Sequence, residues 1–548
     1  MPDISGILNM GRQALSAHQR AIAVTSNNIS NVNTPGYSRQ KPIYETAPPL
    51  NGVFGTGVQI AQVRSVVDTF LQRQIISGQS TLGRFGVEKG LMDRVEGIFN
   101  DTSADGIDTA ISDFFAAVND LSSNPSGTAE RIVLLERGRS LSQTIRSADA
   151  QLKSISRDVD TEIRGRVDEV NVLAEKIADL NKQIQSVENL GNRNTANDLR
   201  DDRVRLLEAL SEKIEVHLLE GQGGELTVTV GSGGRTVALV SGENAYSLST
   251  HSDTNNSGLA KILSGDTDIT RSITDGRLRG LIELRDNLLP AYADRLDKLT
   301  ASIVTSFNTR HEKGFALDGS AGGDFFLSLN VILSEPSTNS GGAEVLPVIS
   351  DASALTFDSY EISFSQDQFT MRNVKTGAST NEFTETDFGF TATFEGISIE
   401  IAGDAAEGDK FNIDIPYQGQ AGKMDMALSD PALVAAAGSA EELPGGNGNA
   451  VLLAQLQDQS FFALNATFQG FYANFTGEVG ARANTSQRNL SVEEVISGKL
   501  DTLRQEVSGV SLDEEMTNLI SFQRAYQAAA KLVTTADELL QTVIEMKR

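Results

Sequence analysis

The chain has no cysteine and only four histidines, and these absences limit its chemistry. Without cysteine, the protein has no disulfide, no catalytic thiolate and no cysteine-based metal site, but its compartment stays open because exported proteins can do without disulfides. The histidines form no i, i+4 pair and no HExxH-like frame; they are His18, His217, His251 and His311. We therefore predict surface or core roles for them, no metal site and no cofactor.

Positive charge and long apolar runs are also scarce. The 46 Lys and Arg residues face 73 Asp and Glu residues, which gives a net charge of −27. Such a chain repels phosphate backbones and anionic lipids, so we expect neither nucleic acid nor membrane as a partner. Nowhere do eighteen apolar residues run together, and the start, "MPDISGILNMGRQALSAHQR", lacks the basic and apolar regions of a secretory signal. If the protein leaves the cell, we expect a route without a cleaved signal peptide.

Both ends of the chain have the pattern of an amphipathic helix. The N-terminal apolar stripe alternates steps of four and three: Ile4, Leu8, Gly11, Leu15, His18, Ile22, Thr25 and Ile29. The C-terminal stripe repeats every seven residues at Leu512, Leu519, Tyr526, Val533 and Leu540, with Met516, Gln523, Ala530, Asp537 and Ile544 four residues later. Ser511 and Glu514 predict a capping box at its start. Each stripe is too thin for a free-standing helix, so the two helices should pair with each other or with other molecules.

The middle of the chain changes its periodicity several times. From about residue 80 to residue 215 the pattern predicts a long helical hairpin, with a turn at "GNRNTAND" (191–198). The segments "LTVTV" and "TVALV" around "GSGG" predict a β-hairpin. Helix returns over residues 277–314 with a break or kink at Pro290, and alternating segments up to about Pro416 predict a second β region.

No stretch of the sequence indicates a catalytic or metal site. "GSGG" lacks the GKS or GKT of a phosphate-binding loop, and Asp513, Glu514 and Glu515 are typical of a helix start, where the macrodipole favours negative charge. Asp409 and Asp414 in "GDKFNIDIP" cannot be assigned acid or base roles without knowledge of their proximity. We therefore predict that the protein is not an enzyme.

The stretch "SNNISNVNTPGYSRQ", residues 26–40, is the most unusual feature of the sequence. Asn31 or Asn33 can end the first helix, and residues 34–37 can form a type II turn with Pro35 and Gly36 at its centre. This local interpretation leaves Asn27 and Asn28 unexplained, because both lie within the helical stripe. A polar residue in a helix seam is costly unless it is paired, and it can specify register.

This stretch resembles the N-terminal signature of the flagellar rod, hook and hook-associated axial proteins. The segment "SLDEEMTNLISFQRAYQAAAKLVTTADELLQTVIEM" resembles their C-terminal signature, and "NDLRDDRVRLLEALS" and "FNTRHEKGFALDG" are most similar to the hook-filament junction members. Together, the resemblance and the two stripes predict an assembly interface of these residues: Ile4, Leu8, Leu15, Ile22, Asn27, Asn28, Asn31, Asn33, Pro35, Gly36, Tyr37, Leu512, Leu519, Phe522, Gln523, Tyr526, Ala530, Val533 and Leu540.

The resemblance implies a structural subunit of the flagellar hook-filament junction, required for filament attachment. Its implied partners are further copies in a ring, the hook protein on one side and hook-associated protein 3 on the other. It also implies an export chaperone and the type III export apparatus, with an extracellular location and no cleaved signal peptide. In this family the terminal helices form the inner coiled-coil layer and the middle domains face outward.

The predicted fold class is multidomain α+β, with terminal helices that pair as a coiled-coil-like core, a long helical middle and inserted β-rich domains. We divide the chain into an N-terminal axial segment (1–75), a long helical domain (76–215), a β-hairpin-containing segment (216–275), a returning helical segment (276–317), a β-rich outer domain (318–440) and a C-terminal helical axial segment (441–548). Two alternatives stay open. A hook or distal-rod protein would lack the helical hairpin, and an exported axial protein with an enzymatic insert would contain a ligand cluster.

Overall fold

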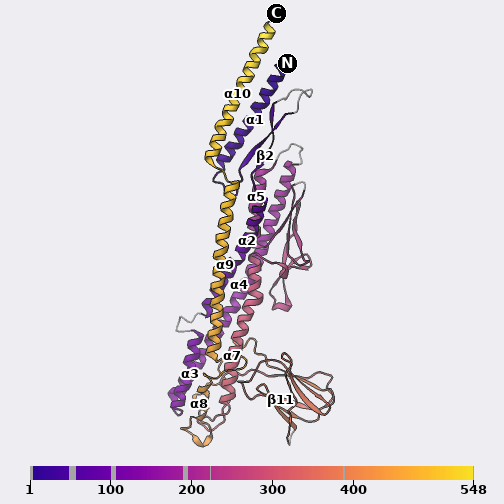
Figure 1. The fold of residues 1–548 in the computed structure, drawn as a ribbon. Helices are drawn as coiled ribbons and strands as arrows, with labels where there is room; N and C mark the ends of the chain where they lie inside the picture. Colours follow the sequence, from indigo (N-terminus) through magenta and orange to yellow (C-terminus); the bar gives the residue numbers. More distant parts are fainter. Residues whose placement is uncertain are drawn as a thin grey trace. The chain divides into compact units, whose positions relative to one another are not determined.

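A computed structural model describes residues 4–47, 57–99, 106–188, 195–221, 224–386 and 389–546. The chain forms two compact units, each made of separate stretches of sequence (Figure 1). Unit 1 comprises Met1–Lys89, Val159–Glu283 and Ser486–Arg548, and unit 2 comprises Gly90–Asp158 and Leu284–Thr485. The predicted α+β class is confirmed, and the division into six consecutive segments stays a prediction.

In unit 1 the two terminal helices pair with each other. Helix α1 (Ile4–Ser30) lies beside α10 (Leu512–Glu545), and the antiparallel hairpin of β1 (Gln40–Thr46) and β2 (Val58–Ser65) packs on α1 (Figure 1). Small residues allow the helices to approach closely, because a Cβ atom added to Gly11 would lie 2.5 Å from Cγ2 of Val533. The terminal stripes, too weak to stand alone, are therefore partnered within the chain.

The rest of unit 1 contains long helices and two small sheets. Its helices are α5 (Asn197–Lys213), α6 (Arg277–Glu283) and the parts of α2 (Thr69–Phe99), α4 (Thr128–Glu188) and α9 (Phe468–Ser508) that fall within its bounds. The apolar stripe of α4 is buried at Ile163, Val167, Val170 and Ile177, as the period of three and four predicts. Most of the predicted turn at 191–198 lies outside the described residues.

The predicted β-hairpin of unit 1 is confirmed by β4 (Leu226–Val230) and β5 (Val237–Ser241), whose residues pair antiparallel. The sequence did not predict the further strands that complete the two sheets. One sheet has the order β3-β4-β5-β6, with β3 at His217–Glu220 and β6 at Asn244–Ala245; the other contains β7 (Leu248–Ser252), β8 (Ala260–Ser264) and β9 (Thr267–Asp268). Strands as short as β6 and β9, with two residues each, are too short to show an alternation of apolar and polar residues.

In unit 2, helix α8 (Gly448–Gln455) packs on α3 (Ile107–Ser123) and α7 (Leu289–His311), and rings from α3, α7 and the chain after α7 form an aromatic core. The predicted break or kink at Pro290 is confirmed as an interruption of the regular helix, because residues 284–288 form a π-helix and Pro290 lies in the first turn of α7. Proline has no N–H to donate and its ring clashes with the carbonyl four residues earlier, which explains why the regular helix is interrupted there.

The second predicted β region of unit 2 is confirmed as two antiparallel sheets. One has the order β10-β18-β12-β13-β14, formed by Ile332–Ser334, Lys410–Asp414, Tyr360–Ser365, Gln368–Asn373 and Ser379–Thr380. The other has the order β11-β17-β16-β15, formed by Glu344–Ile349, Ile397–Ala402, Gly389–Phe394 and Thr384–Thr386. Within the described ranges, no helix combines the length and the hydropathy needed to span a membrane.

Candidate assembly site

The turn that follows α1 has the predicted geometry. The N–H of Tyr37 donates to the carbonyl of Thr34 at 3.2 Å, and Gly36 has a φ of 78°, which defines a type II turn with Pro35 and Gly36 at its centre. A Cβ atom added at Gly36 would also lie 2.6 Å from Cδ of Arg205. Glycine is therefore required there both for its φ and for the space, and the turn brings residues 37–40 back against α1.

Asn28 is the centre of the site, and its buried amide uses its full hydrogen-bonding capacity. Its Oδ1 accepts from the N–H of Gln40 at 3.0 Å and from the hydroxyl of Tyr37 at 2.9 Å. Its Nδ2 donates to the carbonyl of Gln40 at 2.9 Å and to Oε2 of Glu515 at 3.0 Å. An amide side chain has two donors and two acceptor positions, so one residue joins α1 to β1 and to α10.

Two further asparagines support the same turn. The Nδ2 of Asn31 donates to Oδ1 of Asn27 at 3.0 Å, and the Nδ2 of Asn27 donates to the Tyr37 hydroxyl at 3.3 Å. Burial, followed by the charges of nearby carboxylates, raises the pKa of Tyr37, so its hydroxyl stays a donor. Asn33 is exposed in the turn. Asn27 and Asn28 are therefore present because their side chains bond inside the site, and Asn31 is present because its side chain bonds back to Asn27 at the end of the helix.

Arg39 and Glu515 extend the site onto the first turn of α10. The Nε of Arg39 donates to Oε1 of Glu515 at 2.8 Å, and its Nη1 lies 2.6 Å from Oε2 of Glu514. The predicted capping box is therefore wrong: Ser511 occupies the N-cap position without a side-chain cap bond, and Glu514 pairs with Arg39 instead. Assigning Glu515 only to the helix dipole is also wrong, because this carboxylate is buried between Asn28 and Arg39.

The site also contacts α5 through two carboxylates. The N–H of Ser38 donates to Oδ2 of Asp201 at 2.8 Å, and Nε2 of Gln40 donates to Oδ1 of Asp198 at 2.7 Å. Burial is the main cause that raises the pKa of Asp201 to about 6. Ser38, Arg39 and Gln40 are not among the predicted interface residues, although they are the last three residues of the asparagine-rich stretch.

Replacing Asp201 with asparagine should stabilise unit 1 at about pH 7.5 by up to about 3 kcal/mol, because asparagine carries no charge to bury. This free energy corresponds to the rise of the Asp201 pKa from its ordinary 3.8 to about 6. A raised pKa means that this group's contribution to stability is present below pH 3.8 and is lost as pH rises through about 6. The gain of Asp201→Asn should therefore vanish in acid. Urea unfolding across this pH range tests it, with Asp202→Asn as control; a pH-independent difference would contradict the prediction.

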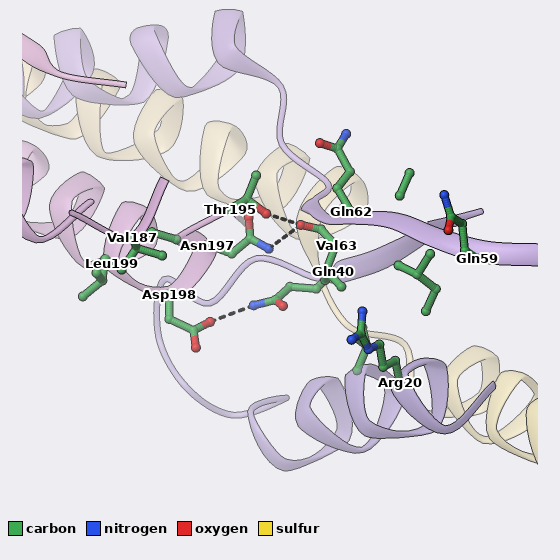
Figure 2. A pocket seen from close by; sticks show the side chains of 14 residues that line it. Arg20, Gln40, Gln59, Gln62, Val63, Val187, Thr195, Asn197, Asp198 and Leu199 are labelled. Atoms are coloured by element: carbon green, nitrogen blue, oxygen red, sulfur yellow. Dashed lines mark hydrogen bonds between the residues drawn. The ribbon is translucent and has the colours of Figure 1, made fainter. Parts of the chain in front are cut away.

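A polar groove of about 780 Å³ lies beside β2 in the same unit (Figure 2). Its lining includes Arg20 from α1 and Asp198 at the start of α5, and Nδ2 of Asn197 donates to the Val63 carbonyl at 2.9 Å. Its other lining side chains are amides, a threonine and aliphatic residues. The groove contains one arginine and one aspartate, and the aspartate is already bonded to Gln40, so the two do not form an acid-base pair. The described residues contain no group of three or more side chains placed to bind a metal ion.

The structure places the predicted interface residues in three environments. Asn28 is buried, whereas Leu8, Leu15, Ile22, Asn27, Asn31, Gly36, Tyr37, Leu519, Phe522, Ala530, Val533 and Leu540 are half-buried. The exposed ones are Asn33, Pro35, Leu512, Gln523 and Tyr526, and Ile4 begins α1. The face of α10 towards α1 is completed by Glu515, Ala529 and Ala536, which are buried and which the sequence stripe did not include.

Comparison with protein families gives four matches along the chain. Residues 92–326 match the model of the flagellar hook-associated protein FlgK helical domain, and residues 334–415 match the flagellar hook-associated protein 1 D2-like domain. The two ends match the flagella basal body rod protein model (8–37) and the flagellar basal body rod FlgEFG protein C-terminal model (504–546). Both terminal matches fall on the α1–α10 pair.

Individual relatives agree with these models. Flagellar hook-associated protein 1 of Escherichia coli is 28% identical, covering 99% of this chain and 100% of the relative. The solved structure of the flagellar hook junction protein FlgK from Burkholderia pseudomallei has a TM-score of 0.59 at 17% identity, covering 79% of this chain and 100% of that one. The flagellar hook protein FlgE of Helicobacter pylori, 26% identical, covers 45% of this chain and 32% of its own length.

These matches define the class first: the chain is a structural protein of the flagellum. It belongs to the flagellar hook-associated protein 1 family and is a structural protein of the hook-filament junction. The hook alternative is the weaker one, because its match is partial and because the described residues from 69 to 213 form helices rather than a β-rich middle.

Proposed function

We propose that this chain acts as a non-enzymatic, cofactor-free subunit that self-associates into a ring at the hook tip through its α1–α10 pair. The observation that carries the proposal is a second apolar surface on α10. One face of this helix packs on α1, and yet large apolar side chains stay exposed on both of its flanks. Exposed apolar residues in this number indicate a surface that another chain covers.

The exposed apolar residues of α10 are arranged in two groups. At 3.6 residues per turn, Leu512, Met516 and Ile520 run from one flank of the α1-facing column towards the side of α10 opposite α1. Leu532 and Leu539 lie on the other flank, about half of each side chain being exposed, and Val543, seven residues after the buried Ala536, continues the column itself. A helix with one intramolecular face and two apolar flanks suits a ring or tube, where each pair has a neighbour on both sides.

The asparagine-centred site has a supporting role in this proposal. It fixes the register of α1 against α10 by directional hydrogen bonds. Such bonds matter here because the buried residues between the two helices are largely alanine and glycine, which bury little hydrophobic area. A buried polar contact of this kind specifies one arrangement better than an apolar contact does. The pair thereby presents its flanks in a defined geometry to the next copy.

Further parts of the proposal rest on family membership. We infer that the ring contacts the hook protein on one side and hook-associated protein 3 on the other. An export chaperone and the type III apparatus would deliver the chain, without a cleaved signal peptide, to an extracellular position on the flagellum. The predicted six-segment division, with outward β-rich domains, belongs to the same proposal.

Electron microscopy of cells deleted for the gene, with flagellin assayed in the medium, tests the junction role. Hooks without filaments, with flagellin lost to the medium, are expected. Absent hooks would indicate a hook or rod component instead, and normal filaments would contradict both assignments.

Replacing Ile520 or Leu539 with aspartate should abolish filament attachment while changing the stability of the free chain by no more than about 0.5 kcal/mol. Both side chains are exposed in the free chain, at 47% and 50%, so a charge there is buried only on assembly. Leu519 and Leu540 are less informative positions because both are half-buried in the monomer. Filament counts by electron microscopy and thermal unfolding of the purified chain provide the two measurements.

The matched control is Thr535→Asp, which places the same charge at an exposed polar position of the same helix. This variant should assemble normally. If Ile520→Asp and Leu539→Asp cells also carried filaments in normal number, α10 flanks would not be the assembly surface.

A further inference from the structure

One peptide group of unit 2 is held between two buried basic side chains from different helices. The carbonyl of Val434 accepts from Nη1 of Arg131, on α4, at 2.6 Å. The N–H of Ala435, in the same peptide group, donates to Nε2 of His311, at the end of α7, at 2.8 Å. Arg131 is 1% exposed and His311 is completely buried. This contact involves none of the residues of the assembly site.

The two bonds of His311 define its protonation state. Because Nε2 accepts from an N–H, it must carry the lone pair, and Nδ1 must carry the proton that it donates to the Gly323 carbonyl at 2.6 Å. The imidazole is therefore neutral. A proton added at Nε2 would remove the acceptor that the described residues give the Ala435 N–H, and two donors would then face each other.

We propose that His311 is an acid-sensitive latch, whose protonation releases the segment 431–437 from α7 and from the turn that follows it. The His311 bond is one of several that hold the segment, and it is the one that a proton removes. Backbone bonds join Phe315 to Ala437 in both directions and Leu317 to Ala432, and the N–H groups of Asn449 and Ala450 donate to the Ala436 carbonyl. Nδ2 of Asn449 donates to the Ala435 carbonyl, and Nη1 of Arg131 also donates to the Pro431 carbonyl. Because Phe315 and Ala437 bond to each other, residues 315–322 would open together with residues 431–437.

The surroundings of the ring oppose a positive charge. The charged groups that act on it are Arg131 from α4 and Asp324 from the loop after α7, and the aromatic rings of Phe307 and Phe325 pack against the imidazole. Burial is the main cause that lowers the pKa of His311 below its ordinary 6.5; Arg131 lowers it further, while the Gly323 bond and Asp324 raise it. A buried cation next to a buried guanidinium is expensive.

The sign of the pH effect follows from this lowered pKa. The contribution of His311 to stability is complete above pH 6.5 and is lost as pH falls towards the folded-state pKa. Over that window the opened fraction of the segment should rise about tenfold per pH unit, since the opened state binds one more proton.

Hydrogen exchange of the full chain between about pH 7.5 and about pH 5, corrected for the intrinsic rate at each pH, tests the latch. The amides of 315–322 and 431–437 should lose protection about tenfold per pH unit below pH 6.5. His311→Gln keeps an acceptor for Ala435 but cannot titrate, so its protection should not follow this slope. His251→Gln, at an exposed position, should behave as the original chain does.

Nitrogen NMR of the four imidazoles in the unsubstituted chain gives an independent measurement in case His311→Gln does not fold. The His311 signal should stay that of the neutral Nδ1-protonated form as pH falls below 6.5, the ordinary pKa of an imidazole. The proposal is overturned if the His311 imidazole gains its proton around pH 6.5, the ordinary value, while the 431–437 amides keep their protection. An acid loss of protection that persists unchanged in His311→Gln would overturn it as well.

Discussion

Replacing Asn28 with alanine should destabilise the pairing of α1 with α10 by about 3–4 kcal/mol. The substitution leaves the N–H and the carbonyl of Gln40 buried without their partner, and each unsatisfied buried polar group costs about 1–3 kcal/mol. It also removes one of the two partners of the buried Glu515 carboxylate. Hydrogen exchange of the α1 and α10 amides would measure the loss, as the change in the free energy of local opening.

Asn33→Ala is the matched control because it removes the same side chain from an exposed position five residues later. We expect its effect to stay within about 0.5 kcal/mol. If both variants opened at equal rates, the four bonds of Asn28 would contribute little, and the alanine and glycine contacts along the seam would be what holds the helices together.

The local parts of this site could be predicted from sequence. Proline at the second position and glycine at the third determine a type II turn by themselves, so residues 34–37 were predicted correctly from their order alone. The heptad spacing likewise predicted two weak helices that need a partner. In both cases the information lies within a few turns of chain.

The long-range parts could not be predicted. Asn28 and Glu515 are 487 positions apart, and nothing in the spacing of either helix identifies one as the partner of the other. The acidic start of α10 has an ordinary explanation in the helix dipole, which concealed the role of Glu515. Asp201, also a partner of the turn, belongs to a helix that the sequence assigned to another domain.

The face of α10 that packs on α1 was also only partly predicted from sequence. The sequence stripe correctly included Leu519, Val533 and Leu540, but it continued through Met516 and Gln523, which are exposed. The packed column instead passes through alanines, and alanine is too small and too common in helices to mark a face by its hydrophobicity. A seam built on small residues is therefore hard to detect from sequence, whereas the larger apolar residues mark the flanks that we assign to neighbouring copies.

Replacing Phe114 with alanine should destabilise unit 2 by about 3–5 kcal/mol. Its ring is completely buried on α3, and its centroid lies 5.0 Å from that of Phe307, 5.6 Å from that of Phe326 and 5.9 Å from that of Phe325. Removing it leaves a cavity among rings that are fixed by α7 and by the chain after it, so the site cannot collapse easily. Urea unfolding measures the change in the free energy of unfolding, and hydrogen exchange of the α3 and α7 amides in a separate experiment measures the loss of protection.

Phe462→Ala is the matched control, because Phe462 belongs to the same unit and is 70% exposed. Its removal should change the free energy of unfolding by no more than about 0.5 kcal/mol. Phe114→Ala should also leave the α1–α10 amides of unit 1 as protected as before, since the aromatic core and the asparagine-centred site belong to different units. Equal losses of protection in both units would mean that the chain unfolds as one cooperative body, and the α1–α10 pair could then not be regarded as an assembly segment with a stability of its own.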